Sequence, residues 1–197
     1  DEHHKHIGHD ARLLSLEITL SLTEQRFDYV IKQLNAAKKQ KSIANETITL
    51  WQQQAFYGAF NDRIKQQDNE ALMLFWQQLP KKDKQSETVV LAYCQVLAEN
   101  QINQPLAKLL LPIIKKGANT SLLSAIRTLP IAQPDSLMAA AQKHLHNEPH
   151  NALWLSLVAH FATTSQQWSL AEKAFNSLVN LEEKQYDKTD LLAFAQV

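Results

Sequence analysis

Apolar residues recur along this chain at the three- and four-residue spacing of amphipathic helices. The stripe is clearest where the i, i+3, i+4 and i+7 positions are Phe27, Val30, Ile31 and Leu34. Residues 10–23 are apolar on more than one side, which is typical of a helix packed between neighbours. Because no segment alternates apolar and polar residues between turn signals, the pattern predicts an all-α fold.

Short polar links divide this pattern into a succession of paired helices. We expect helices over about residues 10–23, 27–34, 45–66, 69–79, 86–100, 105–116, 134–147, 151–164 and 168–181, with a less regular stretch at residues 119–129. Pro80 ends one of them, Pro105 suits a first helical position and Gly117 suits a C-cap. Helix pairs that recur about every 35 to 45 residues are typical of a solenoid, in which each pair packs on the next.

The tetratricopeptide pattern is matched best near the C-terminus. Its large first-helix positions correspond to Trp154, Leu157 and Phe161. Its second-helix alanine and phenylalanine correspond to Ala171 and Phe175, after one extra residue in the turn. Small residues at such positions let helices approach closely, and large ones fill the gaps between repeats.

Earlier helix pairs match this pattern more faintly. Gly58 pairs with Ala71 and Phe75, and Ala107 pairs with Leu111. The sequence therefore predicts a tetratricopeptide-like solenoid of antiparallel helix pairs, wound as a right-handed superhelix. Residues 1–9 would form a flexible His-rich lead-in, and residues 10–197 a single repeat domain. That domain would be truncated in mid-repeat at its C-terminus, because residues 191–195 open a further amphipathic helix.

Composition and charge narrow the classes of function. Gly is scarce at 3 residues and Pro numbers 6, so the chain lacks the turn glycines that sheet-rich folds need. Lys plus Arg equals Asp plus Glu, 20 each, which leaves no basic excess for binding phosphates. We therefore expect no nucleic-acid partner.

Catalytic chemistry has no motif to support it. Cys94, the only cysteine, lies in the apolar helical run of residues 89–97, which predicts a buried, inert thiol. The chain contains no G-x-S-x-G, H-E-x-x-H, P-loop or C-x-x-C motif. The apolar stretch of residues 106–114 is broken by Lys108 and is much shorter than a membrane span. We expect a non-catalytic protein that requires no cofactor.

The histidines suggest a metal or haem site as an alternative. Four of them gather near the N-terminus: His3, His4, His6 and His9. Four imidazoles could bind a transition metal, but ligands in a flexible segment pay an ordering cost, which favours a partly ordered linker. His144 and His146 are two residues apart on a helix and point in different directions. His160, among apolar neighbours, is predicted to be a satisfied packing residue.

Several segments together resemble one protein family. They are LWQQQAFYG at residues 50–58, LFW at 74–76, PDSL at 134–137, LWLSL at 153–157 and QWSLA at 167–171. These segments are similar to the HemY-type proteins, a membrane-anchored tetratricopeptide family associated with bacterial haem synthesis. The resemblance covers about residues 13–181. It implies anchorage in the bacterial inner membrane by N-terminal helices outside this sequence, with the repeat part facing the cytoplasm.

The resemblance also implies a role for the repeat part. Such a protein would assist or regulate late haem synthesis by organising enzymes such as ferrochelatase. In tetratricopeptide solenoids the first helix of each pair lines a concave groove, so polar residues on those helices are candidate partner contacts. The candidates are Gln52, Asp62, Arg63, Glu99 and Asn100. A merely solvated surface is the alternative for these five positions.

Three functions are compatible with the sequence. The leading hypothesis is a protein-interaction scaffold for haem-pathway enzymes. The second is a carrier or sensor that binds haem or a porphyrin directly, through the N-terminal histidines or His160. The third is a tetratricopeptide adaptor unrelated to haem.

Overall fold

The computed structural model describes residues 10–65, 69–117 and 119–197, and every regular element in these ranges is a helix. The all-α prediction is confirmed. Internal contacts divide the chain into two compact units, Asp1–Val96 and Leu97–Val197. No helix in the described ranges is both long and apolar enough to cross a membrane.

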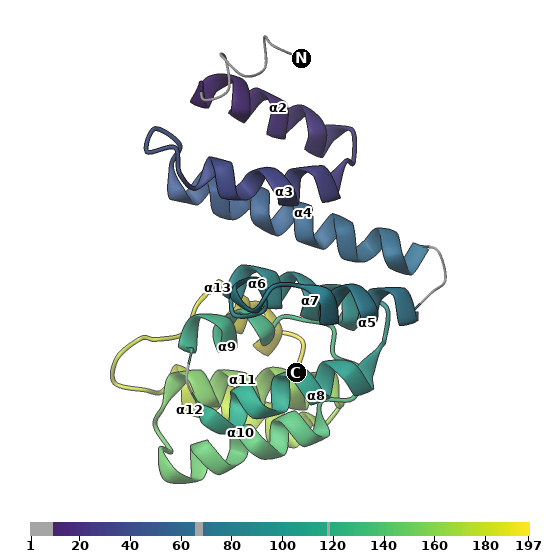
Figure 1. The fold of residues 1–197 in the computed structure, drawn as a ribbon. Coiled ribbons are helices and arrows are strands. Elements are labelled where there is room, and N and C mark those ends of the chain that lie inside the picture. Colours follow the sequence, from purple (N-terminus) through teal and green to yellow (C-terminus); the bar gives the residue numbers. More distant parts are fainter. Residues whose placement is uncertain (1–9, 66–68, 118) are drawn as a thin grey trace, which may run out of the picture. The chain divides into compact units, whose positions relative to one another are not determined.

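Unit 1 is built from successive antiparallel helices (Figure 1). They are α2 (Ala11–Thr23), α3 (Phe27–Ala37), α4 (Asn45–Lys65), α5 (Asn69–Gln78), α6 (Lys81–Lys84) and most of α7 (Glu87–Glu99). Helix α2 contacts α3 and α4, α3 packs on α4, and α4 packs on α5. The four-residue α6 differs from the expected polar link, because Pro80 supplies the extended N-cap from which a single turn begins.

An aromatic cluster fills the core of unit 1. The ring of Phe60 lies 5.6 Å from Phe75 and 5.1 Å from Tyr93, between ring centroids. Trp76 stacks on Tyr93 at 4.2 Å with their planes 4° apart. Burial raises the pKa of the Tyr93 hydroxyl to about 12. The tryptophan at residue 76 is therefore a partly buried packing side chain of this cluster.

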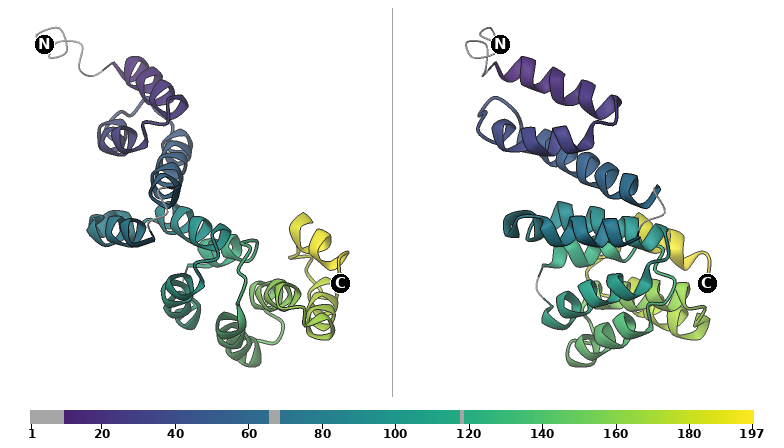
Figure 2. Two further views of the ribbon diagram at one scale, coloured as in Figure 1. Left: turned by 90° about the vertical axis from the view of Figure 1, so that its right-hand side faces the viewer. Right: turned by 45° about the vertical axis from the view of Figure 1, so that its right-hand side comes forward.

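Unit 2 continues the helical architecture (Figure 2). Its elements are α8 (Asn103–Lys116), α9 (Thr120–Ile126), α10 (Asp135–Asn147), α11 (Ala152–Thr164), α12 (Trp168–Val179) and α13 (Lys188–Phe194). Helix α11 is central, since α9, α10, α12 and α13 all contact it. His144 of α10 stacks on Trp154 of α11 at 4.2 Å, and its Nε2–H donates to the carbonyl of Ile114 at 2.8 Å. This histidine therefore joins α8, α10 and α11.

Three helices have the same length, and two of them begin with the same cap. Helices α2, α7 and α11 are each 13 residues long. Asp10 caps α2 with φ −73° and ψ 112°, and Asn151 caps α11 with φ −79° and ψ 113°. Each of these side chains accepts a hydrogen bond from the backbone N–H two residues on. Ser86, another good N-cap residue, stands directly before α7.

The same three helices end in the same turn. Each is followed by a glutamine in the left-handed conformation, which we call the turn glutamine: Gln25 (φ 58°), Gln101 (φ 57°) and Gln166 (φ 57°). The next backbone N–H donates to a carbonyl five residues back at 2.8 Å in all three turns. This pattern is the Schellman motif, which satisfies the last helix carbonyls and starts the antiparallel partner helix. It also accounts for the extra turn residue seen in the α11–α12 sequence.

Four buried positions stand at fixed distances in sequence from the turn glutamine. The residues seven before, four before, five after and nine after it are at most 4% exposed in all three pairs. They are Ile18, Ser21, Val30 and Leu34; Cys94, Leu97, Leu106 and Leu110; and Ala159, Ala162, Ala171 and Phe175. The prediction that Cys94 is a buried thiol is confirmed, and burial raises its pKa to about 12. In α8 the buried residues lie one position before the Ala107 and Leu111 of the faint match.

Candidate interaction site

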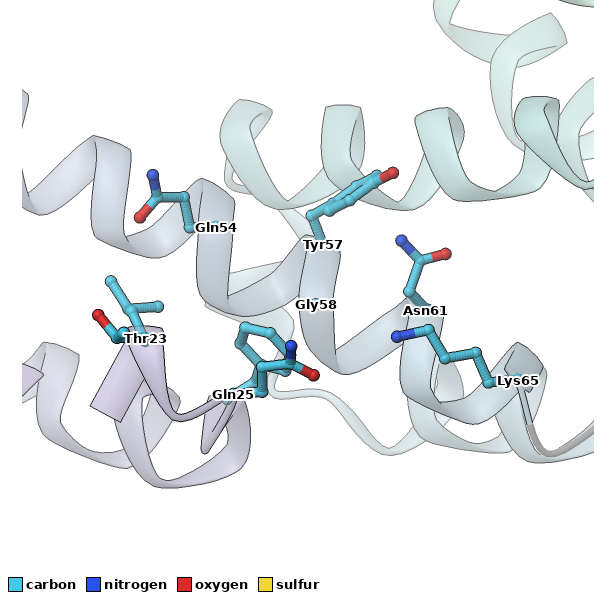
Figure 3. A pocket seen from close by; sticks show the side chains of 9 residues that line it. Thr23, Gln25, Gln54, Tyr57, Gly58, Asn61 and Lys65 are labelled. Atoms are coloured by element: carbon cyan, nitrogen blue, oxygen red, sulfur yellow. The ribbon is translucent and has the colours of Figure 1, made fainter. Parts of the chain in front are cut away.

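A pocket of about 440 Å³ opens between the α2–α3 turn and the middle of α4, and we call it the α2–α4 pocket (Figure 3). It is lined by Leu22, Thr23, Gln25, Phe27, Gln54, Tyr57, Gly58, Asn61 and Lys65. The volume lies within the range of sites that hold a small ligand or a short peptide segment. Because both elements that form it belong to unit 1, its geometry depends on this unit alone.

Gly58 determines how closely the turn approaches α4. A Cβ atom at this position would lie 2.4 Å from the ring of Phe27, much closer than van der Waals contact allows. The absence of a side chain therefore lets the Phe27 ring lie directly against the α4 backbone. The left-handed conformation of Gln25 turns the chain so that Phe27 begins α3 at this point. These two features place the turn beside the polar face of α4.

The polar lining consists mainly of amide groups (Figure 3). Gln25 comes from the turn. Gln54 and Asn61 come from α4, where Gln54 precedes Gly58 and Asn61 follows it. No hydrogen bond within the described ranges occupies these three side-chain amides. A side-chain amide can donate two hydrogen bonds and accept two, so together they offer both kinds of group to a ligand. This combination matches the N–H and C=O groups of a peptide backbone.

One cation lies at the edge of the pocket. The Lys65 side chain is 68% exposed, and its Nζ lies 3.5 Å from Oδ1 of Asp62. A surface ion pair at this distance is weak and leaves the ammonium free to approach a carboxylate on a ligand. Leu22 and Phe27 contribute apolar surface between the polar groups. The pocket therefore presents amide, apolar and cationic groups within one opening.

The structure places three of the sequence-predicted contacts on α4. Gln52 is 5% exposed and lies within the helix packing. Asp62 is half-buried beside Lys65. Arg63 donates to both carboxylate oxygens of Asp28 at 3.0 Å, and its guanidinium lies 3.8 Å from the centroid of the Phe75 ring. Arg63 thus links three helices of unit 1, so a change there disturbs the fold as well as any binding.

The other two predicted contacts lie in unit 2. Glu99 and Asn100 are exposed and stand immediately before the turn glutamine that joins α7 to α8. Three of the five predicted residues therefore belong to unit 1 and two to unit 2. Their role as partner contacts stays a prediction. The residues that line the α2–α4 pocket are a different set.

Unit 2 contains a buried charged cluster around Asp190 of α13. Its carboxylate is 1% exposed and accepts hydrogen bonds from Ser156 Oγ at 2.5 Å and His160 Nε2 at 3.1 Å. Arg127 NH1 lies 3.2 Å from the same carboxylate, and Arg127 also pairs with Asp187. Asp187 and Asp190 form a capping box at the start of α13. His160 is thus a buried, hydrogen-bonded residue, as the sequence predicts.

The geometry of this cluster is that of a structural network. Burial raises the pKa of Asp190, but hydrogen bonds from His160 and Ser156, with the Arg127 charge, outweigh burial and hold the pKa near 2. Ser156 and His160 both bond to the same oxygen, Oδ1. In a catalytic triad the histidine instead lies between the serine and the carboxylate. The cluster therefore attaches α13 to α11 and to the residue that follows α9.

The predicted metal or haem ligands fall into two groups, the N-terminal histidines and His160. Within the described ranges, no three His, Cys, Asp or Glu side chains gather in a way that could hold a metal ion. The predicted alternative ligands, His3, His4, His6 and His9, lie outside the described residues. His160 is 8% exposed, and its Nε2 is already bonded to Asp190. For His160 to bind iron, the Asp190 cluster would first have to open.

The fold and this site define an all-helical protein with a polar surface pocket. Comparison of the chain with protein-family models, with curated proteins and with solved structures finds no match. The interpretation of function therefore depends on the geometry above and on the sequence resemblance.

The sequence carries a signal for the helix register that periodicity alone does not use. An N-cap residue stands fifteen positions before each turn glutamine: Asp10, Ser86 and Asn151. Aligning the chain on these pairs gives the helix register and the position of each turn. The approach of Phe27 to Gly58 has no such signal, because it depends on how α3 packs on α4.

Proposed function

We propose that this chain is a non-catalytic helical-repeat scaffold that binds a segment of a partner protein in the α2–α4 pocket. The observation that carries the proposal is the pocket lining. The amides of Gln25, Gln54 and Asn61 take part in no hydrogen bond within the described ranges, and Lys65 lines the same pocket. Groups of this kind recognise a peptide backbone and a nearby carboxylate.

The recurring helix pairs support the scaffold part of the proposal. Three pairs share the length of the first helix, the turn and the buried positions around it. Such repetition is expected when each pair is one unit of a stack, and repeat proteins use the extended surface of the stack to bind partners. We therefore propose a tetratricopeptide-like solenoid as the class of architecture.

The haem-pathway setting comes from the sequence resemblance alone. On that basis we propose that the protein serves late haem synthesis at the bacterial inner membrane, with ferrochelatase as the first client to test. A protein client requires no haem ligand in the pocket, and the lining contains no histidine. The carrier function has no comparable support from the described residues.

A matched pair of charge reversals tests the pocket. Purified ferrochelatase is titrated against the immobilised chain, and membrane extracts are then used to capture other clients. We expect Lys65→Glu to weaken client binding about tenfold, because it removes an attraction and adds a repulsion. Lys173→Glu, at an exposed position on α12, makes the same charge change outside the pocket and should leave affinity unchanged. Melting curves of the two variants should match that of the unchanged chain.

The outcomes separate the parts of the proposal. If every captured client binds the Lys65→Glu and Lys173→Glu variants equally, the pocket is not the binding site. If ferrochelatase does not bind but another client shows the Lys65 dependence, the scaffold stands and the haem-pathway setting is wrong.

A further inference from the structure

Helix α2 carries an exposed leucine stripe that its equivalents in the chain bury. Leu13, Leu16 and Leu20 are 49%, 67% and 54% exposed. They stand at i, i+3 and i+7, so they lie along one face of the helix, and we call them the outer stripe. Helices α3 and α4 contact α2 (Figure 2). The buried residues of α2, Ile18 and Ser21, stand on the opposite face from the outer stripe.

The turn glutamine identifies the equivalent positions in the other two pairs. The outer stripe stands twelve, nine and five residues before Gln25. The same offsets from the other turn glutamines give Val89, Ala92 and Val96 in α7, and Trp154, Leu157 and Phe161 in α11. All six are at most 4% exposed. The chain therefore buries this stripe in two pairs and leaves it open in the first.

Unit 2 shows what covers the stripe when it is buried. Trp154, the first stripe position of α11, stacks on His144 of α10. Because the three stripe positions share one helix face, that face of α11 is turned toward α10. Helix α10 ends at Asn147 and a short link leads to the N-cap Asn151, so α10 runs antiparallel to α11. The N-cap of α2 repeats the backbone geometry of Asn151.

We propose that the outer stripe of α2 is a docking surface for an amphipathic α-helix, which lies antiparallel to α2 as α10 lies on α11. The stripe is continuous with a hollow of about 1000 Å³ beside the N-terminal half of α2. Leu16 lines this hollow together with Ile43 and Trp51. The docking helix presents an apolar face to the stripe and extends side chains into the hollow.

A helix of a different sequence fits this surface better than a second copy of α2. Two-fold antiparallel pairing of α2 centred on Leu16 would bring Glu17 of one copy next to Glu17 of the other. Like charges placed together in this way are destabilising. The surface is independent of the α2–α4 pocket, since none of the three outer-stripe leucines lines that pocket.

A covalent graft tests the proposal on the full chain. Residues 1–9 are replaced by a copy of residues 134–150, so that the α10 sequence and its link precede Asp10 as they precede Asn151. The fusion gives the docking helix a high effective concentration, which a free peptide of this length would lack. We expect the melting midpoint of the transition that includes α2 to rise by about 5 °C or more, measured by circular dichroism.

Two single substitutions locate the effect. Leu16→Glu should remove the gain in the fusion while leaving the melting midpoint of the unfused chain unchanged, because Leu16 is already in solvent there. Thr19→Glu introduces the same charge on an exposed flank of α2 and should preserve the gain.

Two results would overturn the proposal. One is a fusion whose melting midpoint equals that of the unfused chain, or whose midpoint changes equally with Leu16→Glu and Thr19→Glu. The other is a concentration-dependent dimer of the unfused chain in sedimentation experiments that Leu16→Glu dissolves and Thr19→Glu does not. That result would assign the surface to a second copy.

Discussion

The α2–α3 and α11–α12 pairs use the same backbone plan in different surroundings. Both begin with an Asx N-cap, run 13 residues, turn at a left-handed glutamine and bury the same positions toward the partner helix. Around α11, however, neighbours cover the remaining faces, and Asp190 of α13 adds a buried charge network. Around α2, the equivalent face is open.

The comparison separates what a helix pair encodes by itself from what its neighbours add. The N-cap, the turn and the positions between the paired helices are local, so they recur wherever the pair recurs. The stripe twelve, nine and five residues before the turn glutamine has a role only when a further helix is present. Leucine at all three positions in α2 shows that the sequence retains an apolar surface there.

Removal of the Asp190 carboxylate should reduce the free energy of unfolding more than any other substitution considered. Asp190→Ala leaves Arg127, whose side chain is 10% exposed, without one of its two carboxylate partners and removes the acceptor for His160. Breaking a buried pair in this way costs about 3–5 kcal/mol of stability. The matched change in unit 1, Asp28→Ala, breaks a pair whose carboxylate side chain is 58% exposed and should cost less than about 1 kcal/mol. Equal losses in urea unfolding would contradict the distinction.

The Asp190 carboxyl also makes the free energy of unfolding depend on pH. Its pKa is held near 2, below the ordinary aspartate value of 3.8. A depressed pKa means that the unfolded state binds a proton first, so stability present above about pH 4 is lost as the pH falls toward 2. We expect Asp190→Ala to reduce the dependence of the melting midpoint on pH in this window. Parallel curves for the variant and the unchanged chain would show that the cluster does not contribute.

Truncation of a leucine in the α11 stripe should cause the next largest loss of stability, and truncation of its equivalent in α2 should cause almost none. Leu157→Ala in α11 creates a cavity at a fully buried position and should cost about 2–5 kcal/mol. Leu16→Ala stands at the same offset in α2, where the side chain is 67% exposed, and should change stability by less than about 0.5 kcal/mol. The two variants are compared by urea unfolding under one set of conditions. A large loss in Leu16→Ala would mean that the stripe is already covered.

Replacement of the turn glutamines should change stability least, and it should increase stability where the other substitutions reduce it. Gln25→Gly and Gln166→Gly relieve a left-handed conformation that is costly for a residue with a Cβ, so each should stabilise the chain by about 0.5–1 kcal/mol. Gln54→Gly, within α4, serves as the control and should destabilise by about 1 kcal/mol. If the two turn variants change the melting midpoint in opposite directions, the turns are not equivalent.

The sequence predicts the helices better than their relations to one another. The predicted helices at residues 10–23 and 151–164 begin one residue before α2 and α11 and end at the same residues, because periodicity and N-caps are local signals. The register that the sequence predicts for α8 is one residue too late: Ala107 and Leu111 are a plausible apolar pair, but Leu106 and Leu110 are the buried residues at the fixed offsets from Gln101. Four residues of α6 are too few to show a period.

The candidate site was harder to predict for a physical reason. Gln25 and Lys65 are forty residues apart, and they share a pocket only because Gly58 admits the Phe27 ring. Asp190 meets Arg127 from 63 residues away, a distance that no local motif reports. The charge of Arg63 and its place on a first helix suggest a partner contact, but its guanidinium is bonded to Asp28 and lies over the ring of Phe75.

The central claim is that α2 and α11 are equivalent helices, and that they differ in whether neighbouring helices pack on the stripe. Amide hydrogen exchange of both helices in one sample tests this claim most directly. In the unfused chain, we expect the amides of α2 to exchange at least tenfold faster than those of α11, because α2 opens without disturbing a helix on its outer stripe. In the fusion that carries residues 134–150 before Asp10, exchange in α2 should slow toward the α11 rate. Equal protection of the two helices in the unfused chain, or α2 rates that the fusion leaves unchanged, would contradict the account.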